Sequence, residues 1–216
     1  MMRNVFWSII VLLAWLTGCI AVPVPRVQEH SKTPTLASVL PVVGPTGYCS
    51  GVGLEPFLVV TARHCMERLQ DVLVLGSEPI RPTAVWLGEL DIALLRLDPA
   101  GPRVPVSPLS LRVLLPGNSG FVAGYGCETL GGALTLATRT VSFRGRTIDK
   151  TEIWNGTACH GDSGGGLFNR SGELVAIVDG VHSDSWGVAS YIEAAPLSAA
   201  IDGMLDPQDA RWVNLP

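Results

Sequence analysis

Short apolar runs separated by turn residues dominate the chain from Leu36 onward. They are rich in β-branched residues and none reaches the length of a typical helix, so each predicts a strand. The runs that define the pattern are Phe57–Ala62, Val72–Leu75, Ile92–Leu97, Gly120–Ala123 and Leu174–Val178. Pairs such as Gly131-Gly132 and Ser171-Gly172 predict turns between strands. The pattern therefore predicts an all-β fold, either a barrel or a sandwich.

The two ends of the chain depart from this pattern. Residues 20–35 contain three prolines and several polar residues, which predicts a flexible tether in front of a domain over residues 36–216. Near the C-terminus, Pro196 opens a segment whose apolar positions have helical spacing. These positions are Leu197, Ala200, Ile201, Met204 and Leu205. We expect a set of strands closed by one short C-terminal helix.

The first residues have the features of an export signal. Arg3 supplies a positive start, and the apolar run Val5–Leu16 is shorter than the ~20 residues that a spanning helix needs. The run ends in Leu16-Thr17-Gly18-Cys19, which resembles a bacterial lipobox. We expect residues 1–18 to be a lipoprotein signal peptide and Cys19 to be lipidated, with 19–35 as the tether. An ordinary signal peptide and an uncleaved signal anchor are the alternatives.

Composition narrows the class of protein further. Hydrophobic residues make up 47% of the 216 positions and charged residues only 16%, which is enough to build a core in one domain of ordinary size. The net charge is −4 with no block of like charges, which argues against nucleic-acid binding. His160 and His182 lack a partner at metal-ligand spacing, so we expect no metal and no cofactor. We also expect a monomer.

Three separated motifs carry candidate chemistry. They are Val59–Cys65 (VVTARHC) with His64, Leu90–Leu97 (LDIALLRL) with Asp91, and Ala158–Leu167 (ACHGDSGGGL) with Ser163. Singly, each has an ordinary explanation: a surface histidine, a turn aspartate and a flexible glycine loop. Together, and in this order, they supply a general base, an acid that orients the base, and a nucleophile.

The three motifs resemble those of the trypsin/chymotrypsin family of serine proteases, over roughly residues 42–205. The resemblance implies two six-stranded antiparallel β-barrels and a catalytic triad of His64, Asp91 and Ser163. It also implies an oxyanion hole formed by the N–H groups of Gly161 and Ser163, and protein or peptide substrates.

The resemblance also bears on the cysteines. The chain has five, and lipidation of Cys19 would leave four to pair in an oxidising compartment. In the family a bridge at the positions of Cys49 and Cys65 fixes the histidine loop. A cysteine at the position of Cys159 usually pairs with a later one, but none follows it here. We therefore expect Cys49–Cys65 and Cys127–Cys159.

One departure from the family concerns activation. In animal members, cleavage frees an apolar N-terminus whose ammonium pairs with the aspartate before the nucleophile, here Asp162. No sequence of that type precedes Cys49. We therefore expect Asp162 to pair with another cation, such as Arg139, and the enzyme to be active without zymogen cleavage.

A second departure concerns the substrate pocket, which the resemblance places at Thr157, Asp179, Gly180 and Gly187. Thr157 at its base favours a neutral P1 side chain of small or medium size. Family members usually carry Ser at the position of Asp179, where it supports the catalytic acid. A second carboxylate beside Asp91 would raise the pKa of one of the pair; a slip of one residue in the alignment is the alternative.

The sequence thus predicts a serine endopeptidase tethered by lipid to a membrane of the bacterial envelope, on its periplasmic or extracellular face. A catalytically silent binding or regulatory lipoprotein of the same fold is one alternative. An esterase or acyl transferase that uses the same triad is another, because acyl-enzyme chemistry is shared.

Overall fold

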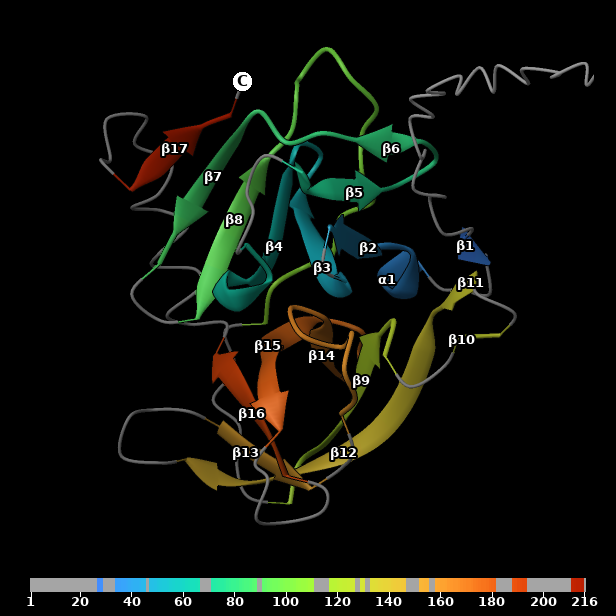
Figure 1. Ribbon diagram of the computed structural model, residues 1–216. Coiled ribbons are helices and arrows are strands. Elements are labelled where there is room, and N and C mark those ends of the chain that lie inside the picture. Colours follow the sequence, from blue (N-terminus) through green and yellow to red (C-terminus); the bar gives the residue numbers. More distant parts are fainter. Residues whose placement is uncertain are drawn as a thin grey trace, which may run out of the picture.

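The computed structural model (Figure 1) describes most of the chain beyond residue 33, together with Val27–Gln28. The described ranges are 27–28, 34–45, 47–66, 71–88, 91–110, 117–126, 129–130, 133–146, 152–155, 158–181, 188–193 and 211–215. Two β assemblies account for most of these residues: the first is built from the N-terminal half of the chain together with its last strand, and the second from the C-terminal half. The predicted all-β fold is confirmed.

An eight-stranded antiparallel sheet forms the first half, in the order β17-β7-β8-β4-β3-β2-β5-β6. Its strands are β2 (Val39–Gly44), β3 (Gly47–Glu55), β4 (Leu58–Ala62), β5 (Leu73–Leu75), β6 (Pro79–Ile80), β7 (Ala84–Leu87), β8 (Ile92–Arg96) and β17 (Trp212–Asn214). The short strands β6 and β17 extend its two edges. The C-terminal strand β17 is held partly by the guanidinium of Arg96, 3.8 Å from the Trp212 ring centroid.

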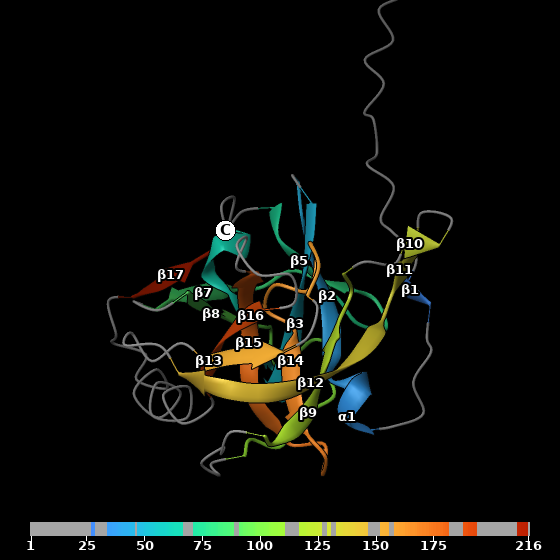
Figure 2. The ribbon, with the colours of Figure 1, turned by 90° about the horizontal axis from the view of Figure 1, so that it is seen from below.

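A closed six-stranded antiparallel barrel forms the second half, in the order β12-β13-β16-β15-β14-β9. Its strands are β9 (Ser119–Gly124), β12 (Ala137–Arg146), β13 (Glu152–Asn155), β14 (Gly166–Asn169), β15 (Leu174–Val181) and β16 (Val188–Glu193). In the view of Figure 2, the long strand β12 runs across the barrel beside β13 and β9. The helix expected from Pro196 lies outside the described residues.

Part of the predicted tether is paired with the domain. β1 (Val27–Gln28) lies parallel to β11 (Ala133–Thr135), which also pairs with β10 (Thr129–Leu130). A single helical turn, α1 (Pro34–Ala37), precedes β2. Within the described ranges, no helix has the length and apolar character needed to cross a bilayer.

The central strands β4, β7 and β8 are almost entirely apolar because both of their faces are buried. Along β4, Val59 points into one core cluster, while Leu58 and Val60 point into another. Ala93 and Leu95 of β8 share the cluster of Val59. The cluster of Val60 also contains residues of the second half, including Tyr125, Leu134, Phe168 and Ile177. One apolar core therefore joins the two halves.

The turn between Cys159 and Gly166 docks onto this junction. The N–H of Ser50 in β3 donates to the carbonyl of Ser163 at 2.8 Å, and the N–H of Gly164 donates to the carbonyl of Val178 at 2.7 Å. Gly164 has φ +76°, and a Cβ there would lie 2.2 Å from Thr61 Oγ1 and 2.3 Å from the carbonyl oxygen of Ser50. The turn can sit this close to β3 and β4 only because the residue is glycine.

We expect Gly164→Ala to lower the free energy of unfolding by at least about 2 kcal/mol more than Gly117→Ala, because it adds overpacking to backbone strain. Gly117 is a matched control: its φ is +90°, but nothing lies within 4 Å of a Cβ built there. Urea unfolding of both variants measures the difference. Equal destabilisation would mean that the close approach contributes nothing.

Candidate active site

His64 and Asp91 meet because β4 and β8 are antiparallel neighbours. Ala62 at the end of β4 pairs with Ile92 at the start of β8. His64 follows β4 in the 3₁₀ turn η1 (Arg63–Met66), and Asp91 immediately precedes β8. The Asp91 carboxylate accepts two hydrogen bonds from this histidine, one from its backbone N–H at 2.8 Å and one from its ring Nδ1 at 2.5 Å. The register of one strand pair thus sets the orientation of the imidazole.

The surroundings of Asp91 favour its ionised form. Burial raises the pKa of this carboxyl, but hydrogen bonds from the His64 ring, from Asp179 and from the His64 backbone, together with attraction to His64, lower it to about 2. A carboxylate that stays charged above this pH can hold the Nδ1–H tautomer of the ring. That tautomer leaves Nε2 as a proton acceptor.

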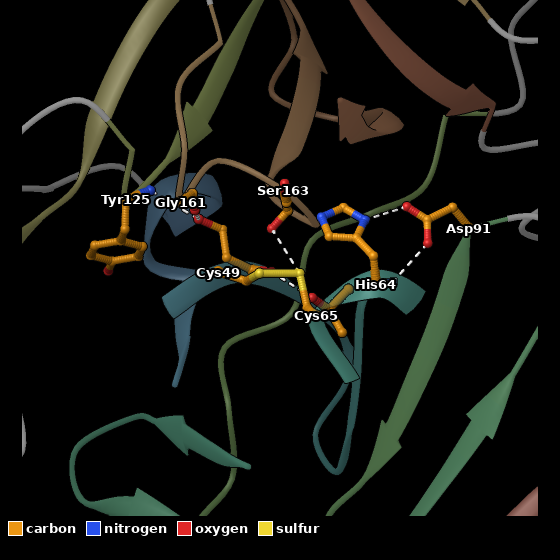
Figure 3. The surroundings of a disulfide bond; sticks show 9 residues. Cys49, His64, Cys65, Asp91, Tyr125, Gly161 and Ser163 are labelled. Atoms are coloured by element: carbon orange, nitrogen blue, oxygen red, sulfur yellow. Dashed lines mark hydrogen bonds and ion pairs between the residues drawn. A yellow bond between two sulfur atoms is a disulfide. The ribbon is translucent and has the colours of Figure 1, made fainter. Parts of the chain in front are cut away.

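Ser163 reaches the same place from the second half of the molecule. Figure 3 shows the imidazole of His64 between the side chains of Ser163 and Asp91, with one ring nitrogen facing each. No hydrogen bond joins the Ser163 hydroxyl to His64 among the described residues, and such bonds often shorten only when substrate is bound. The structure therefore brings together all three residues that the motifs singled out.

Two backbone N–H groups beside Ser163 are available to a ligand. Within the described part of the chain, neither the N–H of Gly161 nor that of Ser163 has a hydrogen-bond acceptor. Gly161 has φ +98°, a backbone conformation that residues with an L side chain rarely adopt. A Cβ at this position would also lie only 2.4 Å from Cε2 of the Tyr48 ring. The hydroxyl of Ser50 donates to the Gly161 carbonyl at 2.7 Å and so fixes the next peptide group.

The carboxylate of Asp162 is completely buried and fully engaged. It forms an ion pair with Arg139 of β12, as expected from the sequence. It also accepts hydrogen bonds from the N–H of Gly126 at 2.9 Å and the N–H of Cys159 at 2.8 Å. These contacts hold the residue before Ser163 from three directions.

Disulfides brace the same region. Cys49 of β3 and Cys65 of η1 are joined, as predicted, with a Cα–Cα distance of 6.2 Å (Figure 3). This bridge ties the turn that carries His64 to β3. Cys159 is also disulfide-bonded. Its predicted partner Cys127 lies outside the described residues, so that pairing stays a prediction.

Of the four residues predicted for the substrate pocket, the structure describes two. Thr157 and Gly187 lie outside the described residues, as does Cys19. Gly180 is half-buried in β15. The side chain of Asp179 hydrogen-bonds to Asp91, so it lies beside the candidate catalytic acid.

In the part of the chain that the structure describes, two groups of side chains have the proximity that a metal ion needs. One is His64 with the two cysteines of the disulfide, whose sulfurs have no thiolate to offer. The other is His64, Asp91 and Asp179, whose ligand atoms all lie within 4.8 Å of one another. In this second group the side chains hydrogen-bond to one another, so each already has a partner.

A hollow of about 380 Å³ lies on the disulfide side of His64. Tyr48, His64, the Cys49–Cys65 bridge and His160 form part of its wall, and the rest comes from Val42, Gly44, Pro45, Gly47 and Val72. It is wide enough for a substrate side chain next to the reacting centre.

The sequence interpretation missed Ser50 and Tyr48. Ser50 donates to the Gly161 carbonyl and accepts a hydrogen bond from the N–H of Tyr125 at 2.9 Å, while Tyr48 packs on Gly161. Both flank Cys49 in sequence. Once the disulfide was predicted, its neighbours were the signal that could have identified them.

Comparisons with known proteins agree with this geometry. The trypsin family model matches residues 26–201. Human granzyme M is 29% identical over 195 residues, which cover 71% of this chain and 75% of granzyme M. The inactive form of the Rv3671c protease of M. tuberculosis H37Rv superposes with a TM-score of 0.68 at 19% identity, covering 87% of this chain and 100% of that one.

Kallikrein-related peptidase 10, in complex with Zn²⁺, superposes with a TM-score of 0.65 at 21% identity, covering 82% of this chain and 98% of that one. The structural likenesses support the two-barrel fold, while the family match spans most of the sequence. The chain belongs to the trypsin family and is a serine endopeptidase that acts on proteins or peptides.

Proposed function

We propose that the peptidase works through a triad of Ser163, His64 and Asp91, with the N–H groups of Gly161 and Ser163 as its oxyanion hole. The single observation that carries this proposal is the placement of the His64 ring. It is held at 2.5 Å from Asp91 and presents its other nitrogen to Ser163 (Figure 3).

In this mechanism the Ser163 hydroxyl oxygen attacks the peptide carbonyl while its proton passes to Nε2 of His64. The carbonyl oxygen becomes an oxyanion, stabilised by the N–H groups of Gly161 and Ser163. The C–N bond then breaks, and His64 gives its proton to the departing amine. Water, activated by His64, hydrolyses the acyl-enzyme and restores the serine. Throughout, Asp91 stabilises the imidazolium.

We further propose that no N-terminal cleavage is needed. The charge of Asp162 is already compensated by Arg139, and two backbone N–H groups complete its hydrogen bonds. The turn that carries Gly161 and Ser163 is therefore held in place by residues inside the domain.

The proposal also covers the cellular location of the enzyme, its oligomeric state and its specificity. The Leu16-Thr17-Gly18-Cys19 sequence supports a lipid anchor on Cys19 and a place in the bacterial envelope, on the periplasmic or extracellular face. We propose a monomer that cleaves next to a neutral P1 residue of small or medium size, because Thr157 stands at the pocket base in the family alignment.

Labelling with a fluorophosphonate probe tests the triad. We expect stoichiometric labelling of the full chain, purified in detergent, with no label on Ser163→Ala and at most about one thousandth of the rate on His64→Ala. Mass spectrometry of the labelled peptide should locate the adduct on Ser163. A folded, disulfide-intact chain that never reacts would be a binding or regulatory module. A labelled chain that cleaves esters but no peptides would be an esterase.

The Asp162–Arg139 pair makes a separate prediction. Arg139→Ala leaves a buried carboxylate without its cation, so the free energy of unfolding should fall by about 3 kcal/mol, and probe labelling should slow with it. Arg170→Ala is the control, since it removes an arginine from an exposed turn. Urea unfolding and labelling rates measure both effects. Wild-type stability and labelling in Arg139→Ala would show that the pair is dispensable.

Lipidation is tested at Cys19. We expect the wild-type chain to take up metabolic palmitate label and Cys19→Ala to take up none, because the thiol that carries the acyl chain is gone. Probe labelling of Ser163 serves as the control for folding. A wild-type chain that stays in the membrane fraction but takes up no palmitate would instead identify an uncleaved signal anchor.

A further inference from the structure

Asp179 occupies an irregularity in β15. Val178 pairs with Tyr191 of β16 and Gly180 pairs with Ser190, so Asp179 is an extra residue in the register. Such bulges turn a side chain away from the direction that the strand would give it. Val178 is fixed on its other edge, because its carbonyl accepts from Gly164 at 2.7 Å and its N–H donates to Gly165 at 2.8 Å. The bulge is therefore anchored directly to the turn that carries Ser163.

The side chain in this bulge meets the candidate catalytic acid. Asp179 forms a side-chain hydrogen bond with Asp91. The ligand atoms of His64, Asp91 and Asp179 all lie within 4.8 Å of one another. An ionised carboxylate has acceptors and no donor. A hydrogen bond between two carboxyl groups therefore needs a proton on one of them.

The surroundings decide which group carries that proton. Asp91 accepts hydrogen bonds from the backbone and ring of His64, and both favour its charged form. Among the described residues, His64 and Asp91 are the titratable groups that face Asp179. Because these hydrogen bonds hold Asp91 as the ionised acceptor, the shared proton belongs on Asp179.

We propose that Asp179 is a positioning residue that acts as a neutral acid: it donates one hydrogen bond to Asp91 and so keeps that carboxylate turned toward His64. The inference rests on the proposed triad and deepens it. Two adjacent charged carboxylates would repel each other, so loss of the shared proton at high pH turns Asp91 away from the ring and slows turnover.

The first test is the pH dependence of kcat and KM for a peptide substrate, with EDTA in every buffer. Asp179→Ala removes the donor and should lower kcat about tenfold at neutral pH, with KM changed less than about twofold. Asp179→Asn keeps a donor that cannot titrate, so it should recover kcat to within about threefold of wild type.

The shape of the pH profile is the decisive readout. In the wild type, kcat should fall at alkaline pH as Asp179 loses its proton, whereas Asp179→Asn should show no such fall. Asp98→Asn is the control, since it makes the same change in an exposed turn and should leave the profile as in wild type. The proposal is overturned if Asp179→Asn keeps the wild-type alkaline limb, or if it is as slow as Asp179→Ala.

A second measurement separates this inference from the proposed catalytic function, because it needs no turnover. In the Ser163→Ala background, the ring of His64 is titrated by NMR with and without Asp179→Asn, and its signals are assigned by their loss in His64→Gln. A neutral Asp179 predicts titration midpoints that agree within about 0.3 pH units. A midpoint lower by about one unit or more in the Asp179→Asn chain would mean that a negative charge had been removed, and would overturn the proposal.

These two measurements fail independently. A wild-type chain without peptidase activity or probe labelling overturns the catalytic proposal, while the NMR titration still reports the charge of Asp179. If the enzyme is active but Asp179→Asn lowers the titration midpoint of His64, the proposed triad stands and only the proposal of a proton shared by Asp179 and Asp91 is overturned.

Discussion

The burial of the Asp162 carboxylate is the constraint on which the geometry around Ser163 depends. A fully buried charge is stable only with a counter-charge and hydrogen bonds, and here Arg139 and two backbone N–H groups supply them. The backbone packed against this carboxyl group leaves no room for a side chain, because a Cβ on Gly124 or Gly126 would lie within 2.6 Å of it. The residue before the nucleophile is thereby fixed from the inside of the second barrel, where solvent cannot compete.

The same turn is also the joint between the two halves. Ser50 of β3 donates its N–H to Ser163 and its hydroxyl to Gly161, and accepts from Tyr125. Around it, the core that contains Val60 and Phe168 is shared by both halves. His64 and Asp91 come from the first half and Ser163 from the second. The distance between base and nucleophile is therefore set by the packing of the two halves.

The sequence is most informative where local chemistry decides the structure. The runs that became β4, β8 and β15 were predictable because strands buried on both faces must be apolar throughout. Arg139 was expected as a partner of Asp162 because the resemblance places a cation against that aspartate and no activation sequence precedes Cys49 to supply it. The hydrogen bond from Ser50 to Gly161 joins residues 111 positions apart, and the bulge at Asp179 depends on the register with β16. Neither leaves a local pattern, so tertiary pairing alone reveals them.

Two carboxyl groups beside the nucleophile are thus stabilised in different ways. Asp162 is neutralised by the guanidinium of Arg139. Asp179 lies against another carboxylate, and in the proposal above it is neutralised by its own proton. The first arrangement holds the turn around Gly161 and Ser163 through an ion pair inside the domain. The second makes the orientation of Asp91 depend on pH, because a proton can leave while the fold stays intact.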